Sequence, residues 1–189
     1  MRIKDLLESS GYSLRGSFTT DLISSKTWLL SELEKISPNY STIYVLGSWY
    51  GNTAILLTLL ENINYTKLIN VESNKKFLSS SKQLLDMLGA KNVEYMLKDA
   101  NQIDYRQLGN NGLVINTSLT DMPGTNWFKN IPKGTMVAMQ ARDHDPGKKF
   151  TGPDDIVKEF PVDVIYSGAK HLEDPETEYN RFMVIGTKQ

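Results

Sequence analysis

The feature that most constrains the fold is a short apolar strand that runs into a glycine-bounded turn and then directly into a helix. It occupies residues 42–54, and Gly47 and Gly51 bound the turn. Glycine is favoured where a turn passes close to a ligand, because its missing side chain lets the backbone approach and tolerates positive φ. Glu72 ends the next apolar run, where an acid can accept hydrogen bonds from both hydroxyls of a ribose. The pattern predicts a nucleoside cofactor site.

Strand and helix patterns alternate along the rest of the chain, with short connections. The strands are expected at 43–46, 67–71, 93–97, 113–116, 135–140, 162–166 and 181–185. The helices are expected at 3–9, 20–36, 53–61, 74–88, 124–130 and 153–160. Such alternation predicts a parallel sheet with helices on both faces.

The end of the chain departs from this alternation. Residues 167–178 form a polar segment that contains a proline and has no helical apolar period. A parallel crossover normally needs a dozen or more residues and usually a helix, so this connection favours a hairpin. We therefore expect an α/β fold with a seven-stranded, mostly parallel, Rossmann-like sheet, helices on both faces and an antiparallel last strand.

Length and composition narrow the class of protein. The 189 residues predict a single domain, with a helical segment at 1–38 that could act as a lid and a Rossmann-like core at 42–187. The 21 basic and 22 acidic residues nearly cancel, so no overall charge favours nucleic acid or an anionic membrane. Cysteine is absent, which excludes disulfides and thiol nucleophiles. With no apolar run of signal-peptide or membrane-spanning length, the chain is expected to be soluble and cytoplasmic.

A charged tetrapeptide follows the fifth expected strand. It is Arg142-Asp143-His144-Asp145, in which a histidine between two acids could act as a base or contribute to a metal site. The chain has only two histidines, so a transition-metal site is not expected. Asp121, Asp143 and Asp145 offer oxygen ligands for Mg²⁺ or Ca²⁺, but their spacing does not require an ion. We predict no metal.

The whole set of patterns resembles the class I S-adenosylmethionine-dependent methyltransferases, over about residues 20–187. In that family the first turn cradles the methionine part of the cofactor, the acid after strand two holds the ribose, and a residue after strand three meets the adenine. The tip of strand four faces the substrate. The resemblance implies cofactor contacts at Gly47, Ser48, Trp49, Tyr50, Gly51, Glu72, Ser73, Asp99, Ala100 and Asn116. Residues 179–186 and the first turn also resemble a less characterised methyltransferase-like group.

The first turn departs from the family pattern at two positions. Val45 stands where the family usually has an acid, and Trp49 stands where it usually has a middle glycine. The carboxylate and amine of the cofactor are then expected to find partners elsewhere, with Asp21, Ser48 and Thr53 as candidates. In the family the N-terminal helices often close the pocket.

Methyl transfer is an in-line displacement, so the protein contributes chiefly by aligning the two reactants. A general base helps when the acceptor holds its proton at neutral pH, and it must lie within hydrogen-bond reach. The candidate catalytic residues are Asn116, Asp121 and His144. Family members that methylate base amines follow the acid or Asn of strand four with two prolines and an aromatic, and residues 116–119 have only the Asn. A small-molecule substrate is therefore favoured over nucleic acid.

Three hypotheses for function stay open at this point. The first is an S-adenosylmethionine-dependent methyltransferase that acts on an oxygen or nitrogen nucleophile of a small molecule and releases S-adenosylhomocysteine. The second is a protein that binds the same cofactor without catalysis, as Val45 and Trp49 suggest. The third is a nicotinamide-dependent dehydrogenase, against which the missing middle glycine and the terminal hairpin count. The oligomeric state and the methyl acceptor do not follow from the sequence.

Overall fold

The computed structural model describes residues 16–109, 111–143, 150–173 and 178–189. Its strands are β1 (Asn39–Leu46), β2 (Asn64–Glu72), β3 (Val93–Leu97), β4 (Gly112–Asn116), β5 (Met136–Arg142), β6 (Val162–Glu173) and β7 (Glu178–Lys188). The α-helices are α3 (Thr20–Ile36), α4 (Asn52–Leu60), α5 (Lys75–Met87), α6 (Asn126–Lys129) and α7 (Pro153–Glu159). Two short 3-10 helices, η1 (Ala100–Gln102) and η2 (Tyr105–Gln107), follow β3.

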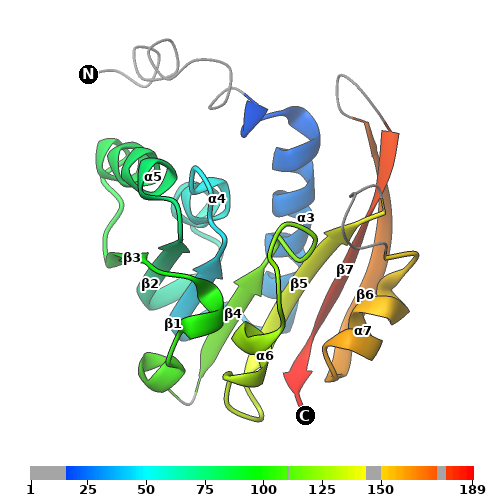
Figure 1. The fold of residues 1–189 in the computed structure, drawn as a ribbon. Helices are drawn as coiled ribbons and strands as arrows, with labels where there is room; N and C mark the ends of the chain where they lie inside the picture. Colours follow the sequence, from blue (N-terminus) through cyan, green and yellow to red (C-terminus); the bar gives the residue numbers. More distant parts are fainter. Residues whose placement is uncertain (1–15, 110, 144–149, 174–177) are drawn as a thin grey trace.

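The seven strands form one sheet in the order β3-β2-β1-β4-β5-β7-β6 (Figure 1). All pairs from β3 to β5 are parallel, and β7 runs antiparallel to both β5 and β6. The predicted fold class is confirmed, including the terminal hairpin. The helix expected at 3–9 lies outside the described residues.

The last two strands are longer than the sequence patterns predicted. β6 continues to Glu173 and β7 begins at Glu178, so most of the expected polar connection is strand. β6 lies at the edge of the sheet, and many of its residues are exposed. Since an edge strand buries little of its surface, polar residues there are compatible with strand structure and hide it from an apolar pattern.

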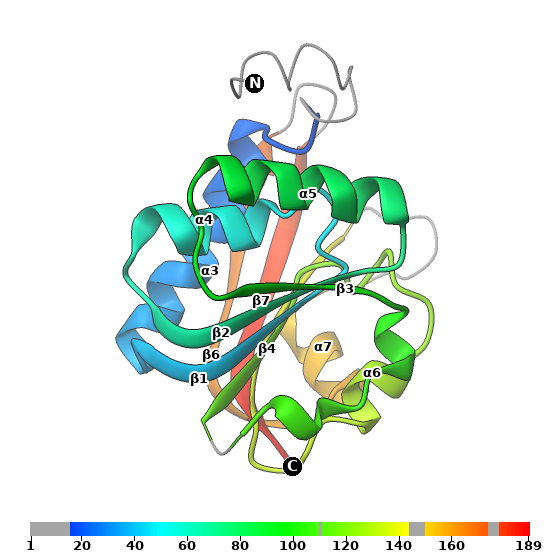
Figure 2. The same ribbon diagram turned by 90° about the vertical axis from the view of Figure 1, so that its left-hand side faces the viewer.

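Helices cover both faces of the sheet (Figure 2). One core layer contains the apolar residues of α3, α4 and α5, and the other contains those of α6 and α7. The interior strand β1 serves both layers, with Ile43 and Val45 facing α3–α5 and Tyr44 and Leu46 facing α6 and α7. This alternation explains why a strand buried on both faces reads as a continuous apolar run.

Local signals fix the ends of α5. The Asn74 side chain accepts a hydrogen bond from the backbone N–H of Lys76 at 2.9 Å, and so caps the start. Gly89 follows the helix with φ at +69°, as a left-handed C-terminal cap requires. In the part of the chain that the structure describes, no helix has the length and apolar character needed to cross a bilayer.

Candidate functional site

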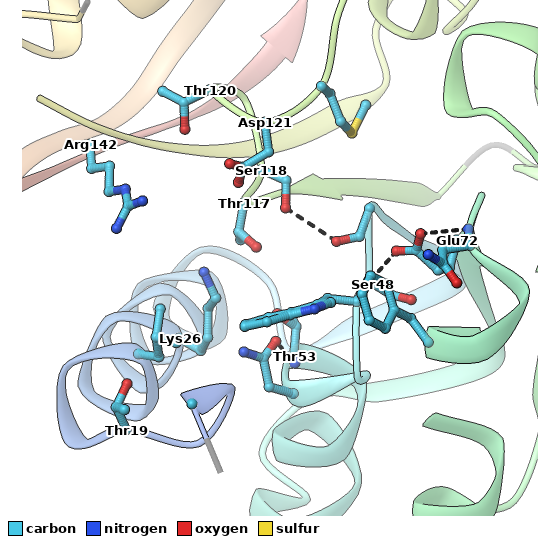
Figure 3. Close-up of a pocket in the computed structure, with 18 of the residues that line it drawn as sticks. Thr19, Lys26, Ser48, Thr53, Glu72, Thr117, Ser118, Thr120, Asp121 and Arg142 are labelled. Carbon is cyan, nitrogen blue, oxygen red and sulfur yellow. Dashed lines mark hydrogen bonds between the residues drawn. The ribbon is translucent and has the colours of Figure 1, made fainter. Parts of the chain in front are cut away.

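A pocket of about 740 Å³ opens at the edge of the sheet where the parallel strands end. Its floor comes from the segments that follow β1, β2 and β4, and α3 forms a side wall (Figure 3). Ligands of open α/β sheets bind at this edge. The lining residues are Gly16, Thr19, Asp21, Leu22, Lys26, Gly47, Ser48, Trp49, Asn52, Thr53, Glu72, Ser73, Asn74, Phe77, Thr117, Ser118, Thr120, Asp121, Met122, Arg142 and Arg181.

The turn between β1 and α4 has left-handed backbone at three positions. The φ angles are +57° at Gly47, +51° at Trp49 and +80° at Gly51. A side chain at Gly47 would meet Met122 Sδ at 3.0 Å and Ser118 Cβ at 3.2 Å. Ser118 Oγ also donates a hydrogen bond to the Gly47 carbonyl at 3.1 Å, so the turn packs closely on the segment after β4.

Glu72 ties the end of β2 to this turn. One carboxylate oxygen accepts the Trp49 N–H at 2.8 Å, and the other accepts the Asn74 N–H at 2.8 Å (Figure 3). The residue is 7% exposed and lines the pocket. A carboxylate has about four acceptor positions, so these two backbone bonds and a longer bond from Ser73 Oγ at 3.5 Å leave capacity for a further donor. Glu72 is therefore held in place and is able to accept a hydrogen bond from a ligand hydroxyl.

Trp49 lies at the position where a left-handed backbone would favour glycine. Its half-buried ring packs at 5.2 Å from the Tyr50 ring and 6.3 Å from the Phe77 ring, between centroids. The aromatic contacts and the N–H bond to Glu72 thus hold a strained conformation.

Two substitutions at Trp49 separate the strain from the loss of the ring. Both Trp49→Ala and Trp49→Gly remove the aromatic contacts, but only alanine keeps a Cβ in the left-handed region. We expect the glycine variant to be more stable than the alanine variant by about 1 kcal/mol. Chemical denaturation of both variants measures the difference. An alanine variant of equal or greater stability would show that the backbone relaxes once the ring is gone.

Helix α3 brings a buried carboxylate to the pocket. Asp21 is 5% exposed, and its Oδ2 accepts a hydrogen bond from Tyr179 Oη at 2.5 Å. Asp21 Oδ1 and Ser48 Oγ are buried, and neither has a hydrogen-bond partner among the described residues. Buried polar atoms are normally paired, so these two atoms indicate a place for a polar ligand group.

Lys26 lies further along α3 and points toward the pocket (Figure 3). It is 3% exposed, and its Nζ lies 3.4 Å from Gln140 Oε1 of β5. Burial and, next, the Arg181 charge lower the pKa of Lys26 well below its usual value, against the opposing effects of Asp121 and Asp21. Burial also raises the pKa of the neighbouring Tyr179. The α3 end of the pocket therefore holds an amine whose charged form is disfavoured by burial and by Arg181.

The pocket brings together five of the predicted cofactor contacts and one predicted catalytic residue. Gly47, Ser48, Trp49, Glu72 and Ser73 line it, and so does the exposed Asp121. Asp21 and Thr53, the candidates for the cofactor's polar head, line it as well. His144 lies outside the described residues.

The other predicted residues lie around the pocket without lining it. Tyr50 is 2% exposed and packs on the Phe77 ring, while Gly51 packs against α5. Asp99 caps η1 by accepting the Asn101 N–H at 2.9 Å, and Ala100 is buried behind it. Asn116 is fully buried, and its Oδ1 accepts the Ser118 N–H at 3.0 Å. Its contact is with the loop that lines the pocket.

The sequence patterns missed Lys26 and Arg181 as pocket residues. A signal for Lys26 existed, because it stands four residues after Leu22 and three before Leu29, on the apolar face of α3. A lysine at a core-facing position needs a polar environment. Arg181 had no such signal, since a strand near the edge of a sheet tolerates a charged residue.

One further group of ligand-type side chains lies on the hairpin. His171, Glu173 and Glu178 place one potential metal-binding atom each within 4.8 Å of one another, and all three residues are exposed. His171 Nε2 and Glu178 Oε2 are 3.6 Å apart, which is within ion-pair distance if the histidine is protonated. These side chains are outside the pocket, and the expectation of no metal remains a prediction.

Comparison with known proteins identifies the fold. No protein-family model matches the sequence, and no curated protein matches it. A methyltransferase from Aquifex aeolicus that depends on S-adenosylmethionine matches with TM-score 0.63 and 11% identity over 100% of both chains. Magnesium protoporphyrin IX methyltransferase from Synechocystis, solved with S-adenosylmethionine bound, matches with TM-score 0.62 and 12% identity over 98% of this chain and 86% of that chain.

A ribosomal RNA methylase from Streptococcus thermophilus is also similar in structure. It matches with TM-score 0.57 and 16% identity over 91% of this chain and 99% of that chain. The chain therefore has the fold of the class I S-adenosylmethionine-dependent methyltransferases. The named substrates of these proteins differ widely, so the fold by itself leaves the acceptor open.

Proposed function

We propose that the protein binds S-adenosylmethionine in this pocket and transfers its methyl group to an oxygen or nitrogen nucleophile of a small molecule. The observation that carries the proposal is Glu72. Its carboxylate lies at the end of β2, is fixed by two backbone N–H groups and keeps acceptor capacity beside the left-handed turn after β1. The methyltransferase fold supports the same function.

The remaining lining residues fit the parts of this cofactor. Glu72 would hold the ribose, with Phe77 beside it as an apolar wall. Asp21 Oδ1 and Ser48 Oγ, which are buried without a partner among the described residues, would receive the amino-acid group. Asp99 and Ala100 follow β3, next to the ribose end, and are proposed to meet the adenine.

The cofactor would supply a methyl group on a positively charged sulfur. The chain then has to exclude water and align an acceptor on the side of the pocket lined by Thr117, Asp121 and Lys26. Lys26 brings an amine to this side, and burial together with the Arg181 charge lowers its pKa well below the usual value. Asn116 would act through the loop that it orders, whereas Asp121 lines the pocket directly.

Calorimetry with S-adenosylmethionine and S-adenosylhomocysteine tests the proposal, with NAD as the competing dinucleotide. Glu72→Gln removes the charge and one acceptor atom at nearly constant volume. We expect it to weaken cofactor binding by about 10-fold to 100-fold, the effect of losing one or two hydrogen bonds to a charged group. Absence of binding to the folded wild-type protein at millimolar cofactor would reject the proposal, and so would stronger binding of NAD.

A matched control keeps this result specific to the site. Glu94→Gln makes the same chemical change on the exposed face of β3, where Glu94 forms a surface ion pair with Lys67 at 2.8 Å. It should leave cofactor binding unchanged, because surface pairs contribute little to stability. Circular dichroism of both variants establishes that any loss at Glu72 is not a loss of folding.

Binding of the cofactor without catalysis is the second candidate, and Trp49 favours it. The bulky Trp49 ring lines the pocket at the position where the methyltransferase family that the chain resembles usually has glycine. If wild-type protein binds the cofactor but transfers no labelled methyl group in cell extracts, while Trp49→Gly does, the ring blocks the reaction. Turnover by the wild-type protein would reject this candidate.

A further inference from the structure

Three basic side chains gather at the α3 end of the pocket. Lys26 comes from α3, Arg142 from the end of β5 and Arg181 from β7, and all three line the pocket. Lys26 and Arg181 are 3% and 4% exposed, and Arg142 is partly buried. Arg142 and Arg181 are paired across the two strands. Buried cations are costly unless they meet anions, so this arrangement favours an anionic partner.

The acidic side chains nearby satisfy this basic group only in part. Asp21 accepts a hydrogen bond from Tyr179, whose ring also packs against the guanidinium groups of Arg142 and Arg181, and Asp121 and Arg142 each have a further interaction. Arg181 Nε is buried without a hydrogen-bond partner among the described residues. The Lys26 ammonium lies 3.4 Å from the oxygen of Gln140, which carries no charge. Lys26 and Arg142 both point into this part of the pocket (Figure 3), where an anionic ligand would complete the group.

The position of the basic group separates it from the predicted cofactor contacts on the turn after β1, whereas Asp21 of α3 lies beside it. In the sheet, β4 lies between β1 and β5, and β7 follows β5. Strands are about 4.8 Å apart, so β5 is about 10 Å and β7 about 14 Å from β1. The turn that would carry the amino-acid end of the cofactor follows β1. Lys26 is placed on the β5 side by the hydrogen bonds between Ser25 and Gln140, at 3.0 Å in both directions.

We propose that the methyl acceptor carries a carboxylate or phosphate group, which binds between Lys26, Arg142 and Arg181. The proposal rests on the proposed function and names the substrate class for the same pocket. Arginine binds both anions through paired N–H groups, and Arg181 Nε has no hydrogen-bond partner among the described residues. The acceptor nucleophile would then project toward β1, where the methyl group is expected.

Binding of an anion also changes the protonation of Lys26. The charged groups that act on it are Asp21 of α3, Asp121 after β4, Arg142 of β5 and Arg181 of β7. Lys170 of β6 also contacts α3, through Ser24 Oγ at 2.8 Å. A bound anion offsets the repulsion by the two arginines, which raises the pKa of Lys26. Binding should therefore take up a proton.

Calorimetry with inorganic phosphate and benzoate tests the proposal, with benzamide as the uncharged analogue of benzoate. The titrations use saturating S-adenosylhomocysteine if it binds, and the protein alone otherwise. We expect both anions to bind more tightly than benzamide, and Arg142→Gln to weaken the binding of both anions about 10-fold.

Titrations in two buffers of different ionisation enthalpy should detect proton uptake that Lys26→Met abolishes. Absence of anion binding at tens of millimolar, or equal binding of benzamide, would overturn the proposal.

Two controls test whether the weaker anion binding comes from the basic group, and whether the anion belongs to the acceptor or to the cofactor. Arg106→Gln makes the same change on η2, where the arginine side chain is 88% exposed, and should not alter anion binding. 5′-Methylthioadenosine lacks the amino-acid part of the cofactor. If Arg142→Gln weakens S-adenosylhomocysteine but not 5′-methylthioadenosine, the basic group holds the cofactor's own carboxylate and the proposal is wrong. If the wild-type protein binds no cofactor at all, the proposed function is rejected instead.

Discussion

Gly51→Ala is expected to lower the free energy of unfolding by about 2–5 kcal/mol, the larger of two stability effects at the pocket edge. Gly51 has φ at +80°, where a side chain costs about 1–2 kcal/mol. A Cβ there would also stand 2.1 Å from Ser81 Oγ. Ser81 is fully buried and accepts a hydrogen bond from Asn70 at 2.8 Å, so it cannot move without breaking that bond. Urea denaturation measures the loss.

Gly89→Ala is the matched control for this substitution. Gly89 also has left-handed backbone, with φ at +69°, but a Cβ added there would meet nothing within 4 Å among the described residues. The free energy of unfolding of Gly89→Ala should fall only by the backbone cost of about 1–2 kcal/mol. Equal losses at Gly51 and Gly89 would show that close packing against α5 contributes nothing. Ser81→Ala in the Gly51→Ala background should recover part of the loss if the clash with Oγ is real.

Lys26→Met is expected to raise the free energy of unfolding by about 1–4 kcal/mol at neutral pH, as apolar replacement of buried charged groups often does. Methionine fills a similar volume with a flexible apolar chain, and it removes the cost of burying an amine that is 3% exposed. It also ends the repulsion by Arg181 and Arg142. The same variant should lose proton-linked anion binding, so stability and function would change in opposite directions.

The pH dependence gives this prediction a definite sign. In the unfolded chain Lys26 titrates near 10.5, and in the folded protein its pKa is well below that value. Between the two pKa values the unfolded state binds more protons, so wild-type stability rises with pH as the folded-state penalty is lost. The gain from Lys26→Met should be largest below the folded pKa and should shrink toward pH 10.5. Denaturation of both proteins across this range measures the difference.

An exposed lysine provides the control. Lys82 forms a surface ion pair with Asp86 at 2.7 Å on α5, and its side chain is 54% exposed. Lys82→Met should change stability by less than about 0.5 kcal/mol, with no comparable pH trend. A Lys26→Met gain that is constant from neutral to alkaline pH would contradict the lowered pKa.

The sequence predicted the fold well because the signals for its elements are local. The bounds of α3 and β3 agree with the expected ranges 20–36 and 93–97. Helical and strand periodicities depend on neighbours along the chain, and Asn74 and Gly89 fix the ends of α5 by contacts within a few residues. β6 was underestimated because an edge strand carries no continuous apolar run.

The candidate site was predictable mainly where it follows the ends of strands. Gly47, Ser48, Trp49, Glu72 and Ser73 line the pocket, since the carboxyl ends of parallel strands meet at one edge of the sheet. The roles predicted for Asp99, Ala100 and Asn116 stay predictions, as does that of His144, which lies outside the described residues. Phe77 lines the pocket from the first turn of α5, a place that sequence spacing alone did not indicate.

By itself, the sequence determined the seven strands, the terminal hairpin and the first turn with its acid at Glu72, because periodicity, turn chemistry and strand ends are properties of short segments. Only the tertiary structure decided what surrounds Lys26. The hydrogen bond from Ser25 to Gln140 spans 115 residues, and that from Tyr179 to Asp21 spans 158. Contacts so distant in sequence exist only once α3 packs over β5 and β7, and that packing brings two arginines and one lysine together in the group for which we propose anion binding.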